Sequence, residues 1–184
     1  KVKDHYYTIS DYLGIDSLDI NNLNYTRKIH PKINKNSHPN VVIIFMESVG
    51  LNRMGLVGNP LNPTPFLDSL ASNGLFFSKF YIPWVSTSRS VFTMLTGIPD
   101  VARRTSSRNP IVKDQYSILS DFIDYEKYYM IGGSASWANI RSLVTYNIKN
   151  LKLIEMEDID RPRVDVWGVS DLDLFKEEIG RAHV

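Results

Sequence analysis

The chain has 184 residues, of which 43% are hydrophobic and 22% are charged, and this is the profile of one ordinary globular domain. Its formal net charge of +1 gives no electrostatic argument for binding nucleic acid. It contains no cysteine, which excludes a disulfide framework, a cysteine nucleophile and thiolate ligands for zinc.

The first part of the chain predicts a lead-in segment followed by the start of a fold. Residues 1–39 are polar and rich in asparagine, and are expected to hold no more than a short helix. The run Val41–Met46 is apolar and β-branched, which predicts a buried strand. Glu47 follows that run directly. A carboxylate at the carboxyl end of a central strand lies where α/β folds place their ligand crevice.

Alternating helix and strand patterns follow. Thr64-Pro65 and Gly74 bound a predicted helix, and residues 75–81 read as a strand. A second helix is predicted from Thr87 to Thr96, before Gly97. The later predicted elements are a surface loop at 100–114, helices at 116–123 and 137–146, strands at 128–131 and 151–154, and a final helix opened by a capping box at Ser170–Asp173. This alternation predicts an α/β fold with a mostly parallel sheet and helices on both faces.

Thr87 heads the hydroxyl-rich turn Ser86–Ser90 at a predicted helix start, where free backbone N–H groups favour an anion. Together with Glu47 it would supply a hydroxyl and a metal-binding carboxylate to one transfer site. The structural alternatives are that Thr87 is a plain helix cap and that Glu47 is a solvated carboxylate at a strand end.

Three motifs, in order and spacing, resemble the alkaline phosphatase–sulfatase superfamily. They are the strand and turn 40–48, the segment 64–77 (TPFLDSLASNGLFF), and Thr87–Ser90 with Leu95–Pro99. The third motif is most similar to the bacterial phosphoglycerol transferases, the lipoteichoic acid synthase group. The resemblance covers residues 40–135 well and 136–177 more loosely, so the catalytic part is expected at 40–177.

The resemblance implies a role for each matching residue. Glu47 would bind a divalent metal, Mn²⁺ or Mg²⁺ rather than Zn²⁺, and Thr87 would be both nucleophile and metal ligand. Arg89, Trp137 and Arg141 would bind the substrate headgroup, with a glycine turn and a core tryptophan as the structural alternative for the segment around Trp137.

The implied activity is transfer of phosphoglycerol from an anionic phospholipid to a hydroxyl acceptor through a covalent threonine intermediate. The implied location is the extracytoplasmic face of a bacterial membrane, with an N-terminal anchor outside these residues. Phosphoethanolamine transferase, phosphodiesterase and sulfatase-like hydrolase stay open, as does a non-catalytic domain that binds a headgroup or polymer. Formylglycine sulfatases need Cys or Ser in C/S-x-P-S-R, and residues 85–89 (VSTSR) lack both that residue and the proline.

The family's remaining metal ligands, an Asp-His pair and a further His, have no match in this chain. Its histidines are His5, His30, His38 and His183. We therefore expect a domain truncated at its C-terminus and inactive by itself. Residues 178–184 (EIGRAHV) correspond to the codons GAG ATC GGA AGA GCA CAC GTC, which contain the start of a sequencing-adapter oligonucleotide, so we interpret them as an adapter-derived tail. The alternative is a natural helix end with Gly180 as its cap.

Overall fold

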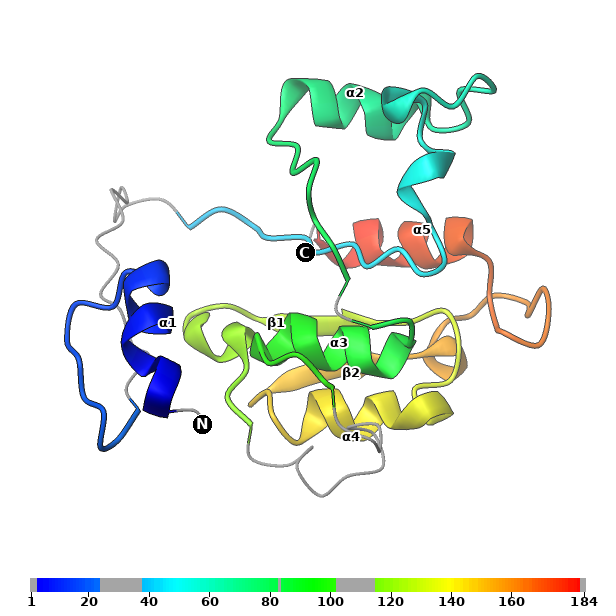
Figure 1. Cartoon of the computed structure of the whole chain (residues 1–184). Helices are drawn as coiled ribbons and strands as arrows, with labels where there is room; N and C mark the ends of the chain where they lie inside the picture. Colours follow the sequence, from blue (N-terminus) through cyan, green and yellow to red (C-terminus); the bar gives the residue numbers. More distant parts are fainter. Residues whose placement is uncertain (1–2, 24–37, 83, 102–114, 183–184) are drawn as a thin grey trace. The chain divides into compact units, whose positions relative to one another are not determined.

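The computed structural model describes residues 3–23, 38–82, 84–101 and 115–182, and Figure 1 shows the elements that they form. The chain divides into two compact units, residues 1–45 and 46–184. The first unit contains the short 3₁₀ helix η1 (Lys3–His5) and the helix α1 (Tyr6–Leu13), which ends at Gly14 in the left-handed conformation. The hydroxyl of the buried Tyr6 accepts a hydrogen bond of 2.8 Å from the backbone N–H of Asp19.

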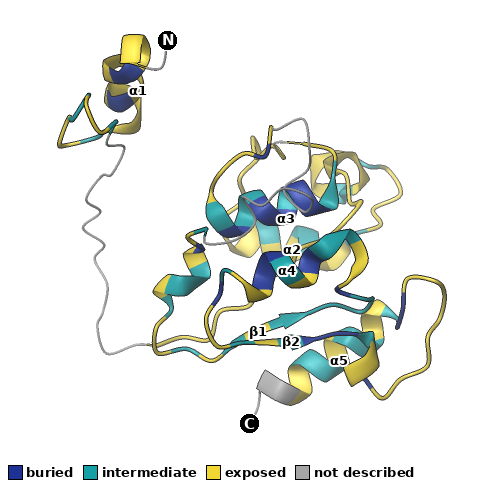
Figure 2. Cartoon of the chain, turned by 90° about the horizontal axis from the view of Figure 1, so that it is seen from below, coloured by how far each residue is buried: buried dark blue, intermediate teal, exposed yellow. Residues whose placement is uncertain are grey.

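The second unit is built around two parallel strands, β1 (Lys127–Met130) and β2 (Leu151–Ile154). Their residues alternate between two hydrophobic clusters. Tyr129, Leu151 and Leu153 pack against a cluster formed with the helices α3 (Thr87–Thr96) and α4 (Ile140–Thr145). Met130 and Ile154 instead pack in a cluster with Leu174 of α5 (Asp171–Ala182). Figure 2 shows α3 and α4 on one face of the strands and α5 on the other, which confirms the predicted parallel α/β arrangement with helices on both faces.

The remaining helices that the described residues of the second unit form are short. They are η2 (Leu51–Arg53), η3 (Gly55–Val57), α2 (Pro65–Asn73), η6 (Ile118–Asp121), η7 (Trp137–Asn139) and η8 (Met156–Asp158). None of the helices in the described part of the chain is both long and apolar enough to cross a membrane.

Several predicted boundaries are confirmed. Helix α2 starts at Pro65 after Thr64 and ends before Gly74, and α3 spans Thr87–Thr96 with Gly97 in the left-handed conformation. Strand β2 matches its predicted range. At the start of α5, the Ser170 hydroxyl accepts from the Asp173 N–H at 3.1 Å and donates to the Asp173 carboxylate at 2.7 Å. Helix α5 continues through Gly180 to Ala182, so Gly180 is not its C-terminal cap.

Two predicted strands are wrong for the described residues. Residues 41–46 and 75–81 belong to no strand, and the apolar side chains of Val41–Met46 are 41–60% exposed. An apolar, β-branched run has the right propensity, but a strand also needs a neighbour to satisfy its N–H and C=O groups. The sheet of the described residues has only β1 and β2, so neither run finds a partner there.

Two predicted helices are modified by local geometry. The Ser117 hydroxyl accepts from the Leu119 N–H at 3.3 Å, and only the 3₁₀ turn η6 forms in the range 116–123. The range 137–146 divides into η7 and α4 because Ala138 and Asn139 have positive φ angles of 49° and 58°. Most of the predicted loop 100–114, with its arginines, lies outside the described residues.

Candidate active site

The hydroxyl of Thr87 donates a hydrogen bond to Oε1 of Glu47. Thr87 is the first residue of α3, and Glu47 lies in a turn at the start of the second unit. The predicted proximity of the two side chains is therefore confirmed. The predicted setting of Glu47, at the end of a strand, is wrong because residues 41–46 form no strand.

The sequence around Thr87 fixes its hydroxyl at the end of a well-packed helix. Ser86 is extended, with φ −141° and ψ 131°, and precedes the first turn as the N-cap residue without a capping side-chain hydrogen bond. Val91, Phe92 and Leu95 bury the inner face of α3 in the main core. The hydroxyl thus lies among the unsatisfied N–H groups of a firmly held helix start, a setting that stabilises negative charge.

The backbone next to Glu47 is strained. Ser48 has a φ of 57°, in the left-handed region that non-glycine residues rarely occupy. Strain of this kind persists where the surrounding structure holds it in place, and it is concentrated at functional sites. The turn therefore directs Glu47 by a defined backbone geometry, although its side chain is exposed to solvent.

Tyr129 of β1 lies close enough to this site for the charge of Glu47 to affect its pKa. Burial, and after it the negative charge of Glu47, together raise the pKa of the Tyr129 phenol to about 12. The sequence analysis did not identify Tyr129, because an aromatic residue in a strand is normally a core residue. Its side chain does pack against the main core, with its hydroxyl kept neutral at ordinary pH.

Arg89, predicted to bind substrate, is buried and already has partners. Its Nη1 donates to the backbone carbonyl of Asp100 at 3.1 Å, and its Nε lies 4.0 Å from the Asp100 carboxylate. The guanidinium also lies over the ring of Trp84, 4.7 Å from the centroid. These contacts favour a structural role, in which Arg89 ties the start of α3 to the segment beyond its C-terminus.

Arg141 and Trp137 occupy the segment that follows β1, as predicted. Arg141 forms an ion pair with Glu155, whose Oε2 also accepts from the Ala135 N–H at 2.8 Å. Trp137 is 46% exposed and is therefore not a core tryptophan. The sequence analysis missed Glu155, although a carboxylate directly after a strand, as at Glu47, was the signal that could have found it.

The donor atoms near Thr87 fit a hard divalent cation but do not complete its coordination. Glu47 and Thr87 offer a carboxylate and a hydroxyl oxygen, the donors that Mg²⁺ and Mn²⁺ prefer. Within the described ranges, no three His, Cys, Asp or Glu side chains come together to hold a metal ion. A stable site needs further ligands in addition to this pair.

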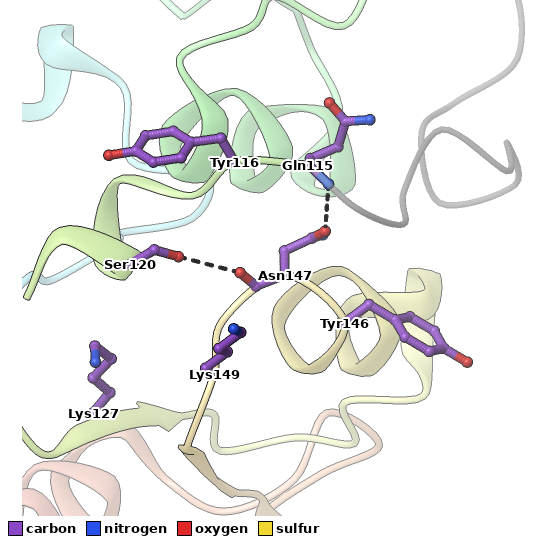
Figure 3. A pocket seen from close by; sticks show the side chains of 7 residues that line it. All are labelled: Gln115, Tyr116, Ser120, Lys127, Tyr146, Asn147 and Lys149. Carbon is purple, nitrogen blue, oxygen red and sulfur yellow. Dashed lines mark hydrogen bonds between the residues drawn. The ribbon is translucent and has the colours of Figure 1, made fainter. Parts of the chain in front are cut away.

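A shallow hollow of about 520 Å³ lies elsewhere in the second unit and shares no lining residue with the Thr87–Glu47 pair. It lies where β1 and β2 begin, and Figure 3 shows its walls. The side-chain oxygen of Asn147 accepts a hydrogen bond from the backbone N–H of Gln115 at 2.9 Å. The backbone carbonyl of Asn147 accepts one from the Ser120 hydroxyl at 3.4 Å. The remaining lining residues are Tyr116, Lys127, Tyr146 and Lys149.

Comparison with known proteins identifies the family of this chain. The model of the sulfatase family matches residues 39–178. A crystal structure from Vibrio parahaemolyticus, described as a protein in the alkaline phosphatase superfamily, superposes with a TM-score of 0.61 at 25% identity. That superposition covers 70% of this chain and 32% of the other.

Curated relatives share shorter stretches. Human arylsulfatase A is 42% identical over 59 residues, which are 32% of this chain and 12% of that protein. Human N-acetylgalactosamine-6-sulfatase is 32% identical over 81 residues, which are 43% of this chain and 15% of that protein. The aligned part thus spans less than a sixth of these relatives.

Proposed function

Because the chain belongs to the sulfatase family, within the alkaline phosphatase superfamily, we propose that it is the nucleophile-bearing part of a metal-dependent phosphoglycerol transferase. The observation that carries this proposal is the hydrogen bond from Thr87, at the start of α3, to Glu47. It joins a hydroxyl and a carboxylate at a helix N-terminus, which is what phosphoryl transfer through a covalent intermediate requires.

In the proposed reaction, Oγ1 of Thr87 attacks the phosphorus of an anionic phospholipid. The Thr87 hydroxyl loses its proton as the new Oγ1–P bond forms and the P–O bond to the lipid breaks, and the leaving lipid oxygen takes up a proton. A hydroxyl acceptor then attacks the same phosphorus and loses its proton, while the Oγ1–P bond breaks and Oγ1 of Thr87 is reprotonated, which leaves phosphoglycerol on the acceptor. Backbone N–H groups at the start of α3 favour the negative charge on the phosphoryl oxygens in both steps.

Members of this superfamily depend on divalent metals, and Glu47 with Thr87 would hold such an ion. A bound dication would lower the pKa of the threonine hydroxyl and offset phosphoryl charge. We propose Mn²⁺ or Mg²⁺ because both available donors are oxygens. The other ligands would come from outside the described residues.

A phosphoester is favoured over a sulfate ester by the residues around the nucleophile. Arylsulfatase chemistry by formylglycine requires a convertible Cys or Ser three positions before a Ser-Arg pair, with a proline directly before that pair. Aligned on Ser88-Arg89, this chain has Val85 and Thr87 at those two positions. The proposed substrate is a phospholipid at the extracytoplasmic face of a bacterial membrane. An N-terminal anchor outside these residues would hold the enzyme at that membrane.

The test is turnover and covalent trapping in the full-length enzyme that carries these residues. With Mn²⁺ and a fluorescent phosphatidylglycerol, we expect headgroup release and a mass increase of one phosphoglycerol on the peptide containing Thr87. Phosphatidylethanolamine serves as the competing donor. Selective use of that lipid would replace the proposal with phosphoethanolamine transfer.

Two further results bear on the alternatives. Release of sulfate from an aryl sulfate, without a phosphorylated peptide, would indicate a hydrolase of the sulfatase type. Metal-independent binding of headgroup without turnover would indicate a binding domain. The 184-residue chain alone is the negative control, and we expect it to be inactive because its described residues complete no metal site.

A further inference from the structure

Two exposed tryptophans form a corner on the surface of the second unit. The rings of Trp137, in η7, and Trp167, in the turn before α5, have centroids 6.0 Å apart and an interplanar angle of 86°. Trp137 is 46% exposed and Trp167 is 67% exposed. We call these two residues the tryptophan corner. The rings are in the T-shaped arrangement, so the indole faces that stay exposed are perpendicular to one another.

Close backbone packing holds Trp167 beside the loop that follows β1. The Val169 N–H donates to the Gly132 carbonyl at 2.9 Å. A Cβ on Gly133 would lie 2.5 Å from the carbonyl oxygen of Trp167, and a Cβ on Gly168 would lie 1.9 Å from that of Gly132. Glycine is therefore required at both positions, and the two backbones touch where the corner is formed.

The Trp137 side of the corner is held by strained backbone. The next two residues, Ala138 and Asn139, both have positive φ angles, although neither is glycine. Ala138 packs against the main core, while its neighbour Trp137 stays exposed. Unfavourable backbone geometry therefore accompanies the exposed position of this indole. Backbone strain of this kind is concentrated at functional sites.

The segment of the chain that carries Trp167 is acidic. Residues 155–173 carry seven carboxylates and two arginines, a net charge of −5, in a chain whose total is +1. The arginines are already engaged, Arg161 with Asp173 and Arg163 with Glu157. An anionic lipid surface or sulfated polymer is disfavoured at such a place, whereas a cation is attracted.

We propose that the tryptophan corner binds an organic ammonium group, with trimethylammonium as the best-fitting form. The electron-rich faces of two indoles attract such a cation, and the acidic segment supplies the complementary field. The same chain already pairs a cation with an indole, since the Arg89 guanidinium lies over Trp84. This site does not depend on the proposed transferase activity.

The test uses intrinsic tryptophan fluorescence of the 184-residue chain during titration with tetramethylammonium chloride or choline chloride, against sodium chloride at equal ionic strength. We expect saturable quenching by the ammonium compounds. The neutral isostere 3,3-dimethylbutan-1-ol should bind much more weakly, because it has the shape of choline without its charge. Equal binding of the isostere, or the absence of saturation, would overturn the proposal.

Matched variants locate the site. Trp167→Leu should weaken binding by roughly 5- to 30-fold. Asp165→Asn keeps an oxygen that can accept the 2.7 Å hydrogen bond from the backbone N–H of Trp167 while removing one charge, and should weaken binding by a smaller factor. Trp84→Phe is the control, because the Arg89 guanidinium already lies over that ring. Equal weakening by the Trp84 and Trp167 variants would show a nonspecific effect and contradict the assignment.

The ammonium group could belong either to the phosphoester substrate or to a separate molecule. Comparing the binding of phosphocholine with that of choline distinguishes the two sources. If it belongs to the phosphoester substrate, phosphocholine with Mn²⁺ should bind the full-length enzyme more tightly than choline does. If it belongs to a separate molecule, the two should bind equally. Thr87→Ala should leave choline binding unchanged, so failure of the proposed catalysis does not affect this result.

Discussion

Thr87 and Glu47 are 40 positions apart in the chain, yet the hydroxyl of one donates directly to the carboxylate of the other. This contact joins the turn at the start of the second unit to the first residue of α3. It also gives the proposed nucleophile a negatively charged neighbour that accepts its hydrogen bond before any substrate binds.

We predict that Thr87→Ala in the full-length enzyme lowers turnover by roughly 10⁴- to 10⁶-fold, as expected when a nucleophile is removed. The stability cost should be only about 1 kcal/mol, because the variant loses one partly exposed hydrogen bond. Thr87→Ser should retain measurable turnover, since a primary hydroxyl can still attack. The measurements are headgroup release and thermal unfolding. Normal turnover by Thr87→Ala would rule out the covalent threonine intermediate.

Arg89 should matter more for stability than for substrate affinity. Arg89→Ala removes the buried cation that faces the Asp100 carboxylate and the donor to the Asp100 carbonyl, and we expect a loss of about 3 kcal/mol in the free energy of unfolding. Arg89→Lys should recover part of the lost free energy of unfolding, but it loses the planar contact with Trp84. Urea denaturation measures the loss. A raised KM with unchanged stability would instead support the substrate-binding role predicted from the family resemblance.

Glu155 should anchor the loop between β1 and α4. Glu155→Ala removes the acceptor of the buried Ala135 N–H as well as the partner of Arg141, and we expect a loss of about 2 kcal/mol. Glu155→Gln retains an acceptor oxygen and should lose less. Arg141→Ala is the comparison, and should cost below about 1 kcal/mol because its side chain is half exposed. Equal losses in all three variants would contradict this division of roles.

Two glycines with positive φ angles make a matched pair. Gly168→Ala would place a Cβ 1.9 Å from the Gly132 carbonyl, whereas Gly58→Ala, at a φ of 96°, meets nothing within 4 Å. We expect Gly58→Ala to cost about 1 kcal/mol from backbone strain alone, and Gly168→Ala to cost at least about 3 kcal/mol because backbone must also move. Thermal unfolding of both variants checks the difference, and equal costs would argue against the close packing of the Trp167 turn on the loop after β1.

Tyr129 should make stability depend on alkaline pH. Its pKa is raised from 10.0 to about 12, so the folded state favours the neutral phenol. The resulting stabilisation is complete below pH 10 and is lost as the pH rises from 10 towards 12. Tyr129→Phe should therefore flatten the decline of stability across that interval, measured by urea denaturation at several pH values. Glu47→Gln should lower the pKa of Tyr129, seen as earlier tyrosinate absorbance.

Helices α2 and α3 could be predicted from the sequence because their signals are local. Thr64-Pro65 starts α2, and Gly97 can adopt the left-handed geometry that ends α3. Residues 41–46 have a comparably clear strand pattern, but pairing depends on distant chain and could not be read from the run itself. The positive φ angles of Ala138 and Asn139 could not be predicted either, because neither residue type normally requires them.

The candidate site was predictable where residue chemistry is distinctive. The proximity of Thr87 and Glu47 followed from the family motifs, and their contact confirms it. Arg89 was assigned to substrate because a sequence does not show that Asp100 and Trp84 surround its guanidinium. Glu155 and Tyr129 were missed because their importance lies in burial and in neighbours far along the chain. The catalytic and metal-binding roles remain predictions.

The pairing of β1 with β2 has a consequence for how this protein is made. The two strands and the helix between them occupy one continuous stretch, residues 127–154, so their pairing closes only a short segment of chain. The other helix of the main core, α3, precedes that stretch. Domains generally fold from the N-terminal side during synthesis. Once Ile154 has left the ribosome, the whole main core is available to assemble, before α5, the helix on the opposite face, has emerged.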